Sequence, residues 1–199
     1  MIYSSLLCYG VHFYPPKSPL ERGTFVYRLY FVRAQSAVSE WNNLSLMNDE
    51  DIDYSIIPEA LLQELALGNE LYIATSALVE LWMRENSAVA RIAWEILSTS
   101  HGDLYLQATA LSALFSTDKE KALHYMSEKV VDCEPLLLNE IMKLIIDSPS
   151  DFVPSSTSKI FQTTIERLTN LRNEQGFIEP DVQQELIQLY NASALSGIK

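Results

Sequence analysis

Histidine, cysteine and carboxylate side chains are the groups of this 199-residue sequence that could bind a metal or take part in catalysis. The three histidines, His12, His101 and His124, lie in separate parts of the chain, and no two of them are spaced i, i+3 or i+4. A protein metal site needs ligands that converge at a defined spacing. The sequence therefore predicts no metal site.

A cysteine nucleophile is not expected either. Cys8 and Cys133 are far apart and outside any CxxC spacing, which is typical of a reduced, cytosolic pair. Cys133 lies between Asp132 and Glu134, and neighbouring carboxylates raise the pKa of a thiol and lower its reactivity. The sequence also lacks a phosphate-binding glycine loop and a GxSxG motif, and it indicates no cleft that would separate the pKa values of paired carboxylates. We predict a protein that is not an enzyme and uses no cofactor.

Acidic residues are concentrated in one part of the chain. From Ala34 to Met83 there is no lysine or arginine, yet nine residues are acidic. Residues 48–53 resemble a calcium loop in residue type, but Tyr54 and Ala60 stand where such a loop has its glycine and its bidentate glutamate, so calcium binding is not expected. Two interpretations stay open: a negative patch for a basic partner with aromatic anchors beside it, or a solvated loop that caps the next helix. The first interpretation selects ten partner-binding residues, which are Trp41, Asp49, Glu50, Asp51, Asp53, Tyr54, Glu59, Glu64, Glu70 and, on a later helix, Gln107.

The whole chain carries a formal net charge of −12 and has a pI of about 4.6. Phosphate recognition depends on lysine and arginine, so neither nucleic acid nor an anionic membrane is expected as a partner. The charge suits a basic protein partner, and solubility alone is the competing explanation. The N-terminal sequence lacks the basic start of a signal peptide, and no stretch reaches the roughly 18 apolar residues of a membrane span. We expect a soluble, cytoplasmic protein.

The elements that must position these residues are helices. Apolar residues at helical spacing, separated by capping residues, predict eight helices joined by short links. Ser87, Asp103 and Thr117 are predicted N-caps. Short links make consecutive helices antiparallel neighbours. The predicted helices span residues 57–67, 69–86, 87–100, 103–116, 117–132, 134–147, 159–176 and 179–195.

One helix sequence occurs twice, 33 residues apart. Residues 71–82 read LYIATSALVELW and residues 104–115 read LYLQATALSALF. A two-helix unit with this period is typical of a stacked helical-repeat array. The shared leucines and alanines, which we expect to pack inward, are Leu71/Leu104, Ala77/Ala110, Leu78/Leu111 and Leu81/Leu114; Tyr72/Tyr105 is also shared. Binding is then expected where the copies differ, at Ala74/Gln107 and Glu80/Ala113.

The second copy lies in a predicted helix without charged side chains. Residues 104–116 carry no charge, and a helix that is apolar on nearly all sides is covered on nearly all sides. We predict a middle inner helix, flanked by outer helices with one wet face. Trp82 and Trp94 lie on apolar stripes and are expected in the core.

Residues 56–148 resemble HEAT-type repeats. The pattern Leu-x-x-x-x-x-Ala-Leu-x-x-Leu at 71–81 and 104–114 is similar to the second helix of such repeats, and residues 134–146 continue it with a poorer match. The resemblance implies a mainly α fold, a short α-solenoid of about eight helices. An irregular helical bundle with a local similarity is the alternative.

Residues 1–35 are predicted to form an N-terminal capping segment on a helical-repeat domain of residues 36–199, because the end of a solenoid needs a cover. In TFVYRLYFVRA (24–34) aromatic residues alternate, which favours one or two strands. A helix is the alternative, since SPLE (18–21) has the form of a capping box.

A helical-repeat array offers an extended surface, so the leading hypothesis is a protein-binding module. Its most specific form is an immunity protein that neutralises a basic toxin, such as a nuclease effector. The resemblance to bacterial toxin-immunity proteins is one of small size and acidity, and of no motif. An acidic inhibitor suits a basic toxin because steering speeds association. The alternative is a general scaffold or adaptor that binds through the inner-helix face around Gln107, Asn139 and Lys143.

Overall fold

The computed structural model describes residues 52–152, 158–171 and 178–196. This described part consists of eight α-helices and two short 3₁₀ helices and contains no strand. The mainly α class and the number of helices are confirmed. The α-helices are α3 (Glu59–Ala66), α4 (Leu71–Met83), α5 (Val89–Thr99), α6 (Leu104–Thr117), α7 (Lys119–Lys129), α8 (Pro135–Asp147), α9 (Ser158–Asn170) and α10 (Pro180–Ser196), and the 3₁₀ helices are η3 (Tyr54–Ile56) and η4 (Pro149–Phe152).

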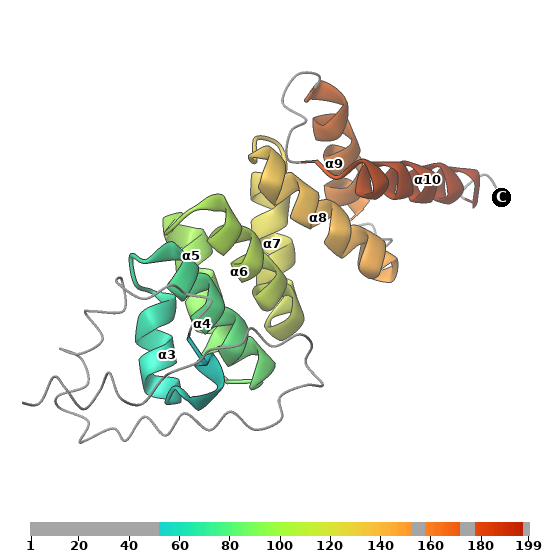
Figure 1. Ribbon diagram of the computed structural model, residues 1–199. Coiled ribbons are helices and arrows are strands. Elements are labelled where there is room, and N and C mark those ends of the chain that lie inside the picture. The colour runs from blue at the N-terminus through green and yellow to red at the C-terminus, as the bar shows by residue number, and fades with distance from the viewer. Residues whose placement is uncertain (1–51, 153–157, 172–177, 197–199) are drawn as a thin grey trace, which may run out of the picture.

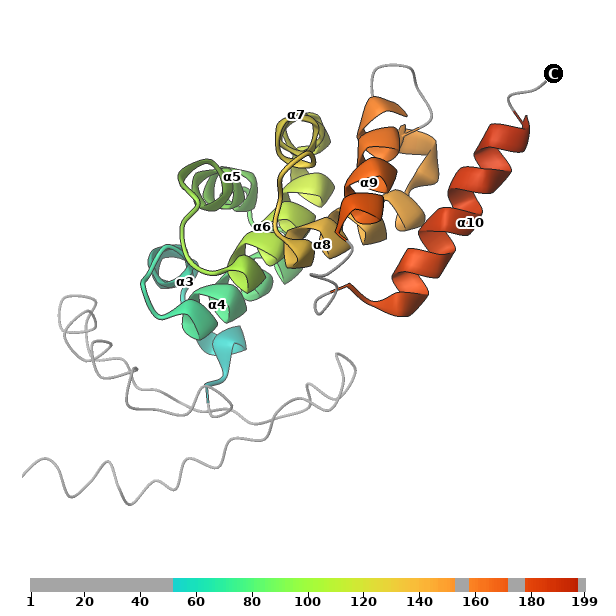
Figure 2. The same cartoon turned by 90° about the horizontal axis from the view of Figure 1, so that it is seen from above.

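The helices lie in two layers, as the two views in Figures 1 and 2 show. We call α3, α5, α7 and α9 the outer layer, and α4, α6, α8 and α10 the inner layer. The inner helices pack on one another in chain order, α4 on α6, α6 on α8 and α8 on α10. The stack thus grows by one helix pair at a time, an arrangement that fits an α-solenoid.

Hydrogen bonds between successive pairs repeat the 33-residue period. The His101 ring Nε2 lies 3.1 Å from the Gly68 carbonyl oxygen, 33 residues earlier. Both residues lie in the turn that leads into an inner helix. Two further bonds span nearly the same number of residues: Lys119 Nζ donates to Asp151 Oδ2 at 2.7 Å across 32 residues, and Arg167 Nη2 donates to the Cys133 carbonyl at 3.0 Å across 34 residues. The sequence repeat is therefore also a repeat in space.

Most shared positions of the two copies form the core. Ala77, Leu78 and Leu81 in α4 are fully buried, and so are their counterparts in α6. Tyr72 and Tyr105 differ, because they are 64% and 60% exposed. At about 100° per residue, five residues separate Tyr72 from Ala77 by about 140° around the helix. Each tyrosine therefore lies on the opposite face of its helix from the core residues. Among the shared leucines, Leu71 is 37% exposed, so the expectation that it packs inward is wrong.

Helix α6 is central but not covered on all sides. It packs against α4, α5, α7 and α8, as expected of a middle inner helix. Tyr105 is exposed, and Ala108, Thr109 and Ser112 are only half-buried. These four positions follow helical spacing and form one strip. The absence of charge on α6 therefore marks an uncharged open strip as well as a buried core.

One predicted helix start is confirmed and two are shifted by one residue. Asp103 caps α6, accepting a hydrogen bond from a backbone N–H of the first turn at 2.9 Å. Ser87 does not cap α5, because Ala88 is its N-cap residue and the helix has no side-chain cap. Asn86 Oδ1 accepts the Ala88 N–H at 2.9 Å in the link before the helix. Thr117 is the last residue of α6, and Asp118 caps α7. At α7 two neighbouring polar side chains could cap, and the tight link to α6 decides which one does.

The predicted N-terminal capping segment, residues 1–35, lies outside the described residues. Its strands and its boundary with the helical-repeat domain stay predictions.

Candidate functional site: the groove of the inner layer

The partner-binding residues predicted from sequence lie in different parts of the molecule. Trp41, Asp49, Glu50 and Asp51 are outside the described residues. The other six lie at three places: Asp53 and Tyr54 at η3, Glu59 and Glu64 on the outer helix α3, and Glu70 and Gln107 in the inner layer, where Glu70 precedes α4 and Gln107 is in the first turns of α6. Sequence proximity in this segment thus does not place the acidic side chains on one face.

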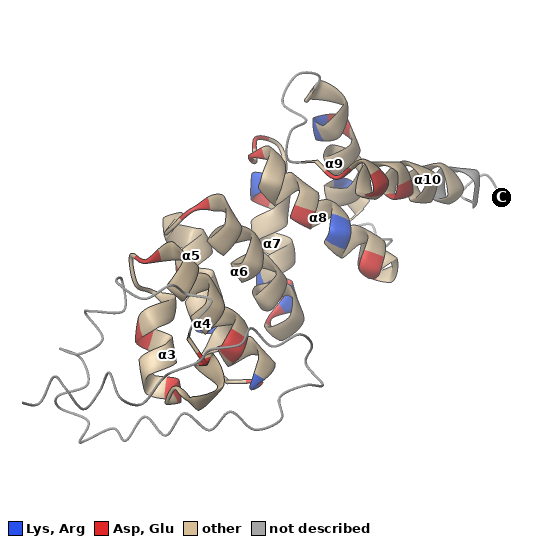
Figure 3. Ribbon diagram, viewed as in Figure 1, with Lys and Arg blue, Asp and Glu red and all other residues tan. Residues whose placement is uncertain are grey.

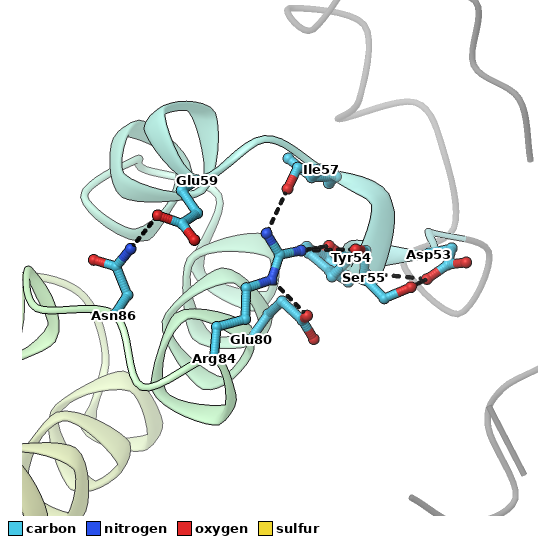
Figure 4. A network of polar contacts seen from close by, with 8 residues as sticks. All are labelled: Asp53, Tyr54, Ser55, Ile57, Glu59, Glu80, Arg84 and Asn86. Carbon is cyan, nitrogen blue, oxygen red and sulfur yellow. Dashed lines mark hydrogen bonds and ion pairs between the residues drawn. The ribbon is translucent and has the colours of Figure 1, made fainter.

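The corner around η3 is held by a single guanidinium, that of Arg84 at the end of α4 (Figure 4). It donates to the carbonyl oxygens of Tyr54 (2.8 Å), Ser55 (2.9 Å) and Ile57 (2.8 Å) and to Glu80 Oε1 (2.9 Å). The side chains of Arg84 and Glu80 are only 22% and 11% exposed. These four bonds anchor the chain that enters the first helix pair.

Two acidic residues of this corner have local structural partners. Asp53 Oδ1 accepts hydrogen bonds from the Ser55 backbone N–H at 3.0 Å and the Ser55 hydroxyl at 2.6 Å. Glu59 Oε2 accepts one from the Asn86 amide at 2.6 Å. The Asp53 interaction is of the capping kind that the solvated-loop interpretation describes, whereas the Glu59 interaction joins α3 to the link after α4.

The predicted partner-binding residues on the outer helix α3 lie on a surface of mixed charge. A shallow hollow there is lined by Glu59, Gln63, Glu64 and Arg91, among others. Arg91 contacts Gln63 Oε1 at 3.3 Å and pairs with Glu95 on its own helix at 3.6 Å. A cation stands among these carboxylates, so this hollow is not a purely negative surface.

The positions where the two copies differ are mostly internal. Ala74 and Ala113 are fully buried, and Glu80 is 9% exposed and paired with Arg84. Gln107 is half-buried, and its side-chain amide donates to the Gly102 carbonyl at 3.4 Å. Of the four, Gln107 has the most accessible side chain.

A larger hollow of about 660 Å³ lies across the inner layer, and we call it the inner groove. Its residues come from α4, α6 and α8, at positions that share one face of each helix. Trp82, expected in the core, is half-buried here and lines the groove. The lining combines aromatic residues (Trp82, Tyr105, Phe115), hydroxyls (Thr109, Ser112, Ser116), acids (Glu140, Asp147, Glu179) and one cation, Lys143.

The α8 side of the inner groove is a connected polar cluster. Lys143 Nζ lies 2.6 Å from Glu179 Oε1. Asn139 donates its amide to the same carboxylate at 3.1 Å and accepts the Glu179 backbone N–H at 3.0 Å. On the α6 side, the Ser112 hydroxyl donates to Glu140. Glu140 and Glu179 are thereby held in place at the edge of the groove.

Three carboxylates act on the one cation of the groove. The hydrogen bond that Lys143 donates to Glu179 is the main cause that raises the pKa of Lys143. Burial, the next largest effect, lowers this pKa, and the charges of Glu179, Glu140 and Asp147 raise it. The pKa of Glu179 is lowered, first by its hydrogen bond with Lys143 and then by that with Asn139. Since one ammonium faces three carboxylates, the groove keeps an excess of negative charge.

The charge of the described helices is divided unequally between the layers (Figure 3). The outer helices carry six acidic residues (Glu59, Glu64, Glu95, Glu120, Glu128, Glu166) and six basic ones (Arg91, Lys119, Lys121, Lys129, Lys159, Arg167). The inner helices carry five acidic residues (Glu80, Glu140, Asp147, Asp181, Glu185) and one basic one, Lys143. Within the described helices, the negative excess therefore belongs to the inner layer.

The described residues offer little for catalytic chemistry. No three histidine, cysteine or carboxylate side chains among them gather as metal ligands would. Cys133 is buried, and burial is the main cause that raises its pKa to about 12, with Asp132 and Glu134 adding smaller effects in the direction expected from the sequence. A thiol with such a pKa is protonated at neutral pH and a poor nucleophile.

Within the described residues, no helix has the length and apolar run needed to cross a bilayer.

Comparison of the chain with known proteins found no relative. No family model matches the chain, and no curated protein or solved structure is significantly similar to it.

Several groove residues were not among those selected from the sequence. Asn139 and Lys143, named there for the scaffold alternative, do line the inner groove, but Glu140, Asp147 and Glu179 were not singled out. A signal was present: Leu136, Glu140, Lys143 and Asp147 recur at steps of three and four on one helical face. That signal identifies a polar face, and only the neighbouring helices show that it borders a groove.

Proposed function

We propose that this chain is a HEAT-type helical-repeat module that binds a protein partner with a basic surface and performs no catalysis itself. The observation that carries the proposal is the inner groove, where an aromatic, uncharged floor on α4 and α6 meets an acidic border on α8. The most specific form of the proposal is an immunity protein that neutralises a cationic toxin, such as a nuclease effector.

The two parts of the groove suit the two requirements of such a complex. Tyrosine, tryptophan and arginine dominate binding hot spots, and the groove supplies Trp82 and Tyr105 in partly exposed positions. Negative charge on one layer steers a positive partner toward that layer and raises the association rate. Glu140 and Glu179 are held by neighbouring side chains, so little side-chain entropy is lost when a cation pairs with them.

A second candidate function is a general scaffold, favoured by the uncharged strip of α6. A partner that binds mainly to Tyr105, Ala108 and Thr109 would use largely apolar contacts. Its affinity would depend little on salt, whereas a complex held by charge would form more slowly as salt rises.

The test is co-purification with the product of the adjacent gene, followed by measurement of affinity for two charge-neutralised variants. Glu140→Gln with Asp147→Asn removes two charges from the groove. Glu120→Gln with Glu128→Gln removes two from the outer layer and is the matched control. We expect at least tenfold weaker binding for the groove variant and little change for the control.

Equal weakening by both variants would reduce the proposal to a general effect of net charge. Absence of any complex would overturn the electrostatic partner proposal. The immunity form has its own test: expression of the chain should rescue growth of cells that produce the neighbouring protein, and no rescue would refute that form.

A further inference from the structure

The exposed tyrosines occupy equivalent positions in successive inner helices. Tyr72 and Tyr105 are 33 residues apart, each second in its helix, and 64% and 60% exposed. The copies are also in register in space, because a Cβ added to Gly102, just before α6, would come within 3.3 Å of the Leu71 side chain at the start of α4. Burial in the core does not account for this repeated tyrosine.

The third inner helix, α8, has an apolar residue at the position equivalent to the two tyrosines, and acidic residues follow it. Leu136, second in α8 as the tyrosines are in their helices, lines the inner groove. Glu140 and Asp147 follow on the same face of α8. A segment that lies across the starts of the inner helices thus passes Tyr72 on α4, which is outside the groove lining, then Tyr105 on α6, and then Leu136 and Glu140 on α8.

The spacing of this row matches an extended chain. Packed helices have axes about 8–10 Å apart, and an extended chain advances about 3.3 Å per residue. Neighbouring inner helices therefore lie opposite residues about three apart in an extended segment. A helix lying across the same row advances only about 4.5 Å in three residues, so it would need side chains about six or seven positions apart instead of three.

We propose that the inner layer binds an extended segment of the partner, with apolar residues three positions apart over Tyr72 and Tyr105 and an arginine or lysine three positions further, beside Glu140 at the edge of the inner groove. The negative excess on the inner layer is the reason for choosing a basic residue there. This inference rests on the proposed function and deepens it, since it states the form and the spacing of what is bound.

The experiment is selection of peptides from a random twelve-residue library displayed on phage, with the full chain as bait. Enriched peptides should share a pattern of two apolar residues and one basic residue at steps of three, in either chain direction. Synthetic versions of the enriched peptides are then measured by fluorescence anisotropy. Shortening one step from three residues to two should weaken binding at least fivefold, and replacing the basic residue by glutamate at least tenfold.

Variants of the chain locate the peptide. Tyr105→Ala and the pair Glu140→Gln, Asp147→Asn should each weaken binding at least fivefold. Val131→Ala replaces an exposed apolar residue, 63% exposed, between α7 and α8 and should leave binding unchanged. Circular dichroism melting of each variant separates a loss of contact from a loss of folding, and Tyr105→Phe, which keeps the ring, should bind nearly as well as the native chain.

The possible failures are distinguishable. If no peptide is enriched, if the enriched peptides are amphipathic helices, or if the groove variants bind them unchanged, the extended-segment inference is wrong. The proposed function would still stand if the partner protein bound in a manner sensitive to Glu140 and Asp147. If the selected peptides instead match a segment of this chain, the groove serves self-association or internal docking, and that outcome also overturns the inference.

Discussion

In the described outer helices acidic and basic side chains are equal in number, whereas the described inner helices carry five acids and one base, and one of these acids, Glu80, is paired with Arg84 directly after α4. Outer charges pair with neighbours on the surface, as Lys121 does with Asp118 at 3.0 Å and Arg91 with Glu95 at 3.6 Å. Exposed pairs of this kind contribute little to stability. The comparison indicates that the outer layer has balanced charges with local partners, while the inner layer joins the pairs and presents the groove.

Within the inner layer, the buried and the exposed shared residues of α6 should differ most in their effect on stability. Leu111 is fully buried, and Leu111→Ala removes core contacts and leaves a cavity, so we expect the free energy of unfolding to fall by about 3 kcal/mol. Tyr105→Ala should change it by less than about 0.5 kcal/mol. Urea denaturation measures both. Similar losses for the two variants would show that Tyr105 is part of the core, as Leu111 is.

The two arginines of opposite layers are expected to differ next. Arg84→Met leaves three carbonyl oxygens and the nearly buried Glu80 without their donor, and we expect a loss of about 2 kcal/mol. Arg91, whose side chain is 60% exposed, should lose less than about 0.5 kcal/mol on the same substitution. Thermal denaturation at matched pH compares them. A small effect of Arg84→Met would mean that η3 docks without this clamp.

The salt dependence of the association rate should differ between variants of the inner layer and variants of the outer layer. For a complex with a basic partner, raising NaCl from about 50 to 500 mM should lower the association rate constant roughly tenfold. The variant with Glu140→Gln and Asp147→Asn should show a shallower dependence, and the variant with Glu120→Gln and Glu128→Gln a dependence close to that of the native chain. Surface plasmon resonance gives the rates. Parallel salt profiles for all three proteins would contradict steering by the inner layer.

The smallest effect concerns the pKa of Glu179. Lys143→Met removes the main cause of the lowered pKa, so the Glu179 pKa should rise toward the ordinary glutamate value of about 4.3. Because the folded-state pKa is lowered, the stabilisation by this pair is present above that ordinary value and is lost as the pH falls through the lowered one. Carbon-detected NMR titration of the carboxyl groups measures the shift.

A matched control for this titration lies in the outer layer. Lys121→Met should raise the pKa of Asp118, which its hydrogen bonds with Lys121 lower, and leave Glu179 unchanged. If Glu179 does not respond to Lys143→Met, the cluster at the groove is not coupled as described.

Local signals predicted the helices well and their caps less well. Gly68 follows the end of α3 closely enough that an added Cβ would lie 3.0 Å from the Leu65 carbonyl oxygen, and Pro180 begins α10, as their residue types indicate. Ser87 and Thr117 were predicted as caps, but α5 has no side-chain cap and Asp118, beside Thr117, caps α7. Neighbouring polar side chains have similar capping propensity, so the geometry of the tight links decides between them.

The candidate site was predicted less well than the fold. The stretch without lysine or arginine from Ala34 to Met83 led to the prediction of a site made of acidic residues that are neighbours in the chain. In the described part, Asp53 and Glu59 make local hydrogen bonds and Glu64 lies on the outer layer. The groove instead combines residues from three helices, and Glu140 and Glu179 stand about forty residues apart in sequence.

The sequence by itself determined the helices, their alternation and their 33-residue period, because propensity, capping and apolar spacing act over a few residues. It also determined that Leu78 and Leu111 would be buried, since the repeat places them on the face that must pack. Only the tertiary structure decided which layer carries the negative excess, that Glu80 is neutralised by Arg84, and that Tyr72 and Tyr105 face outward. These features depend on which helix faces lie side by side after packing, and no spacing within one helix contains that information.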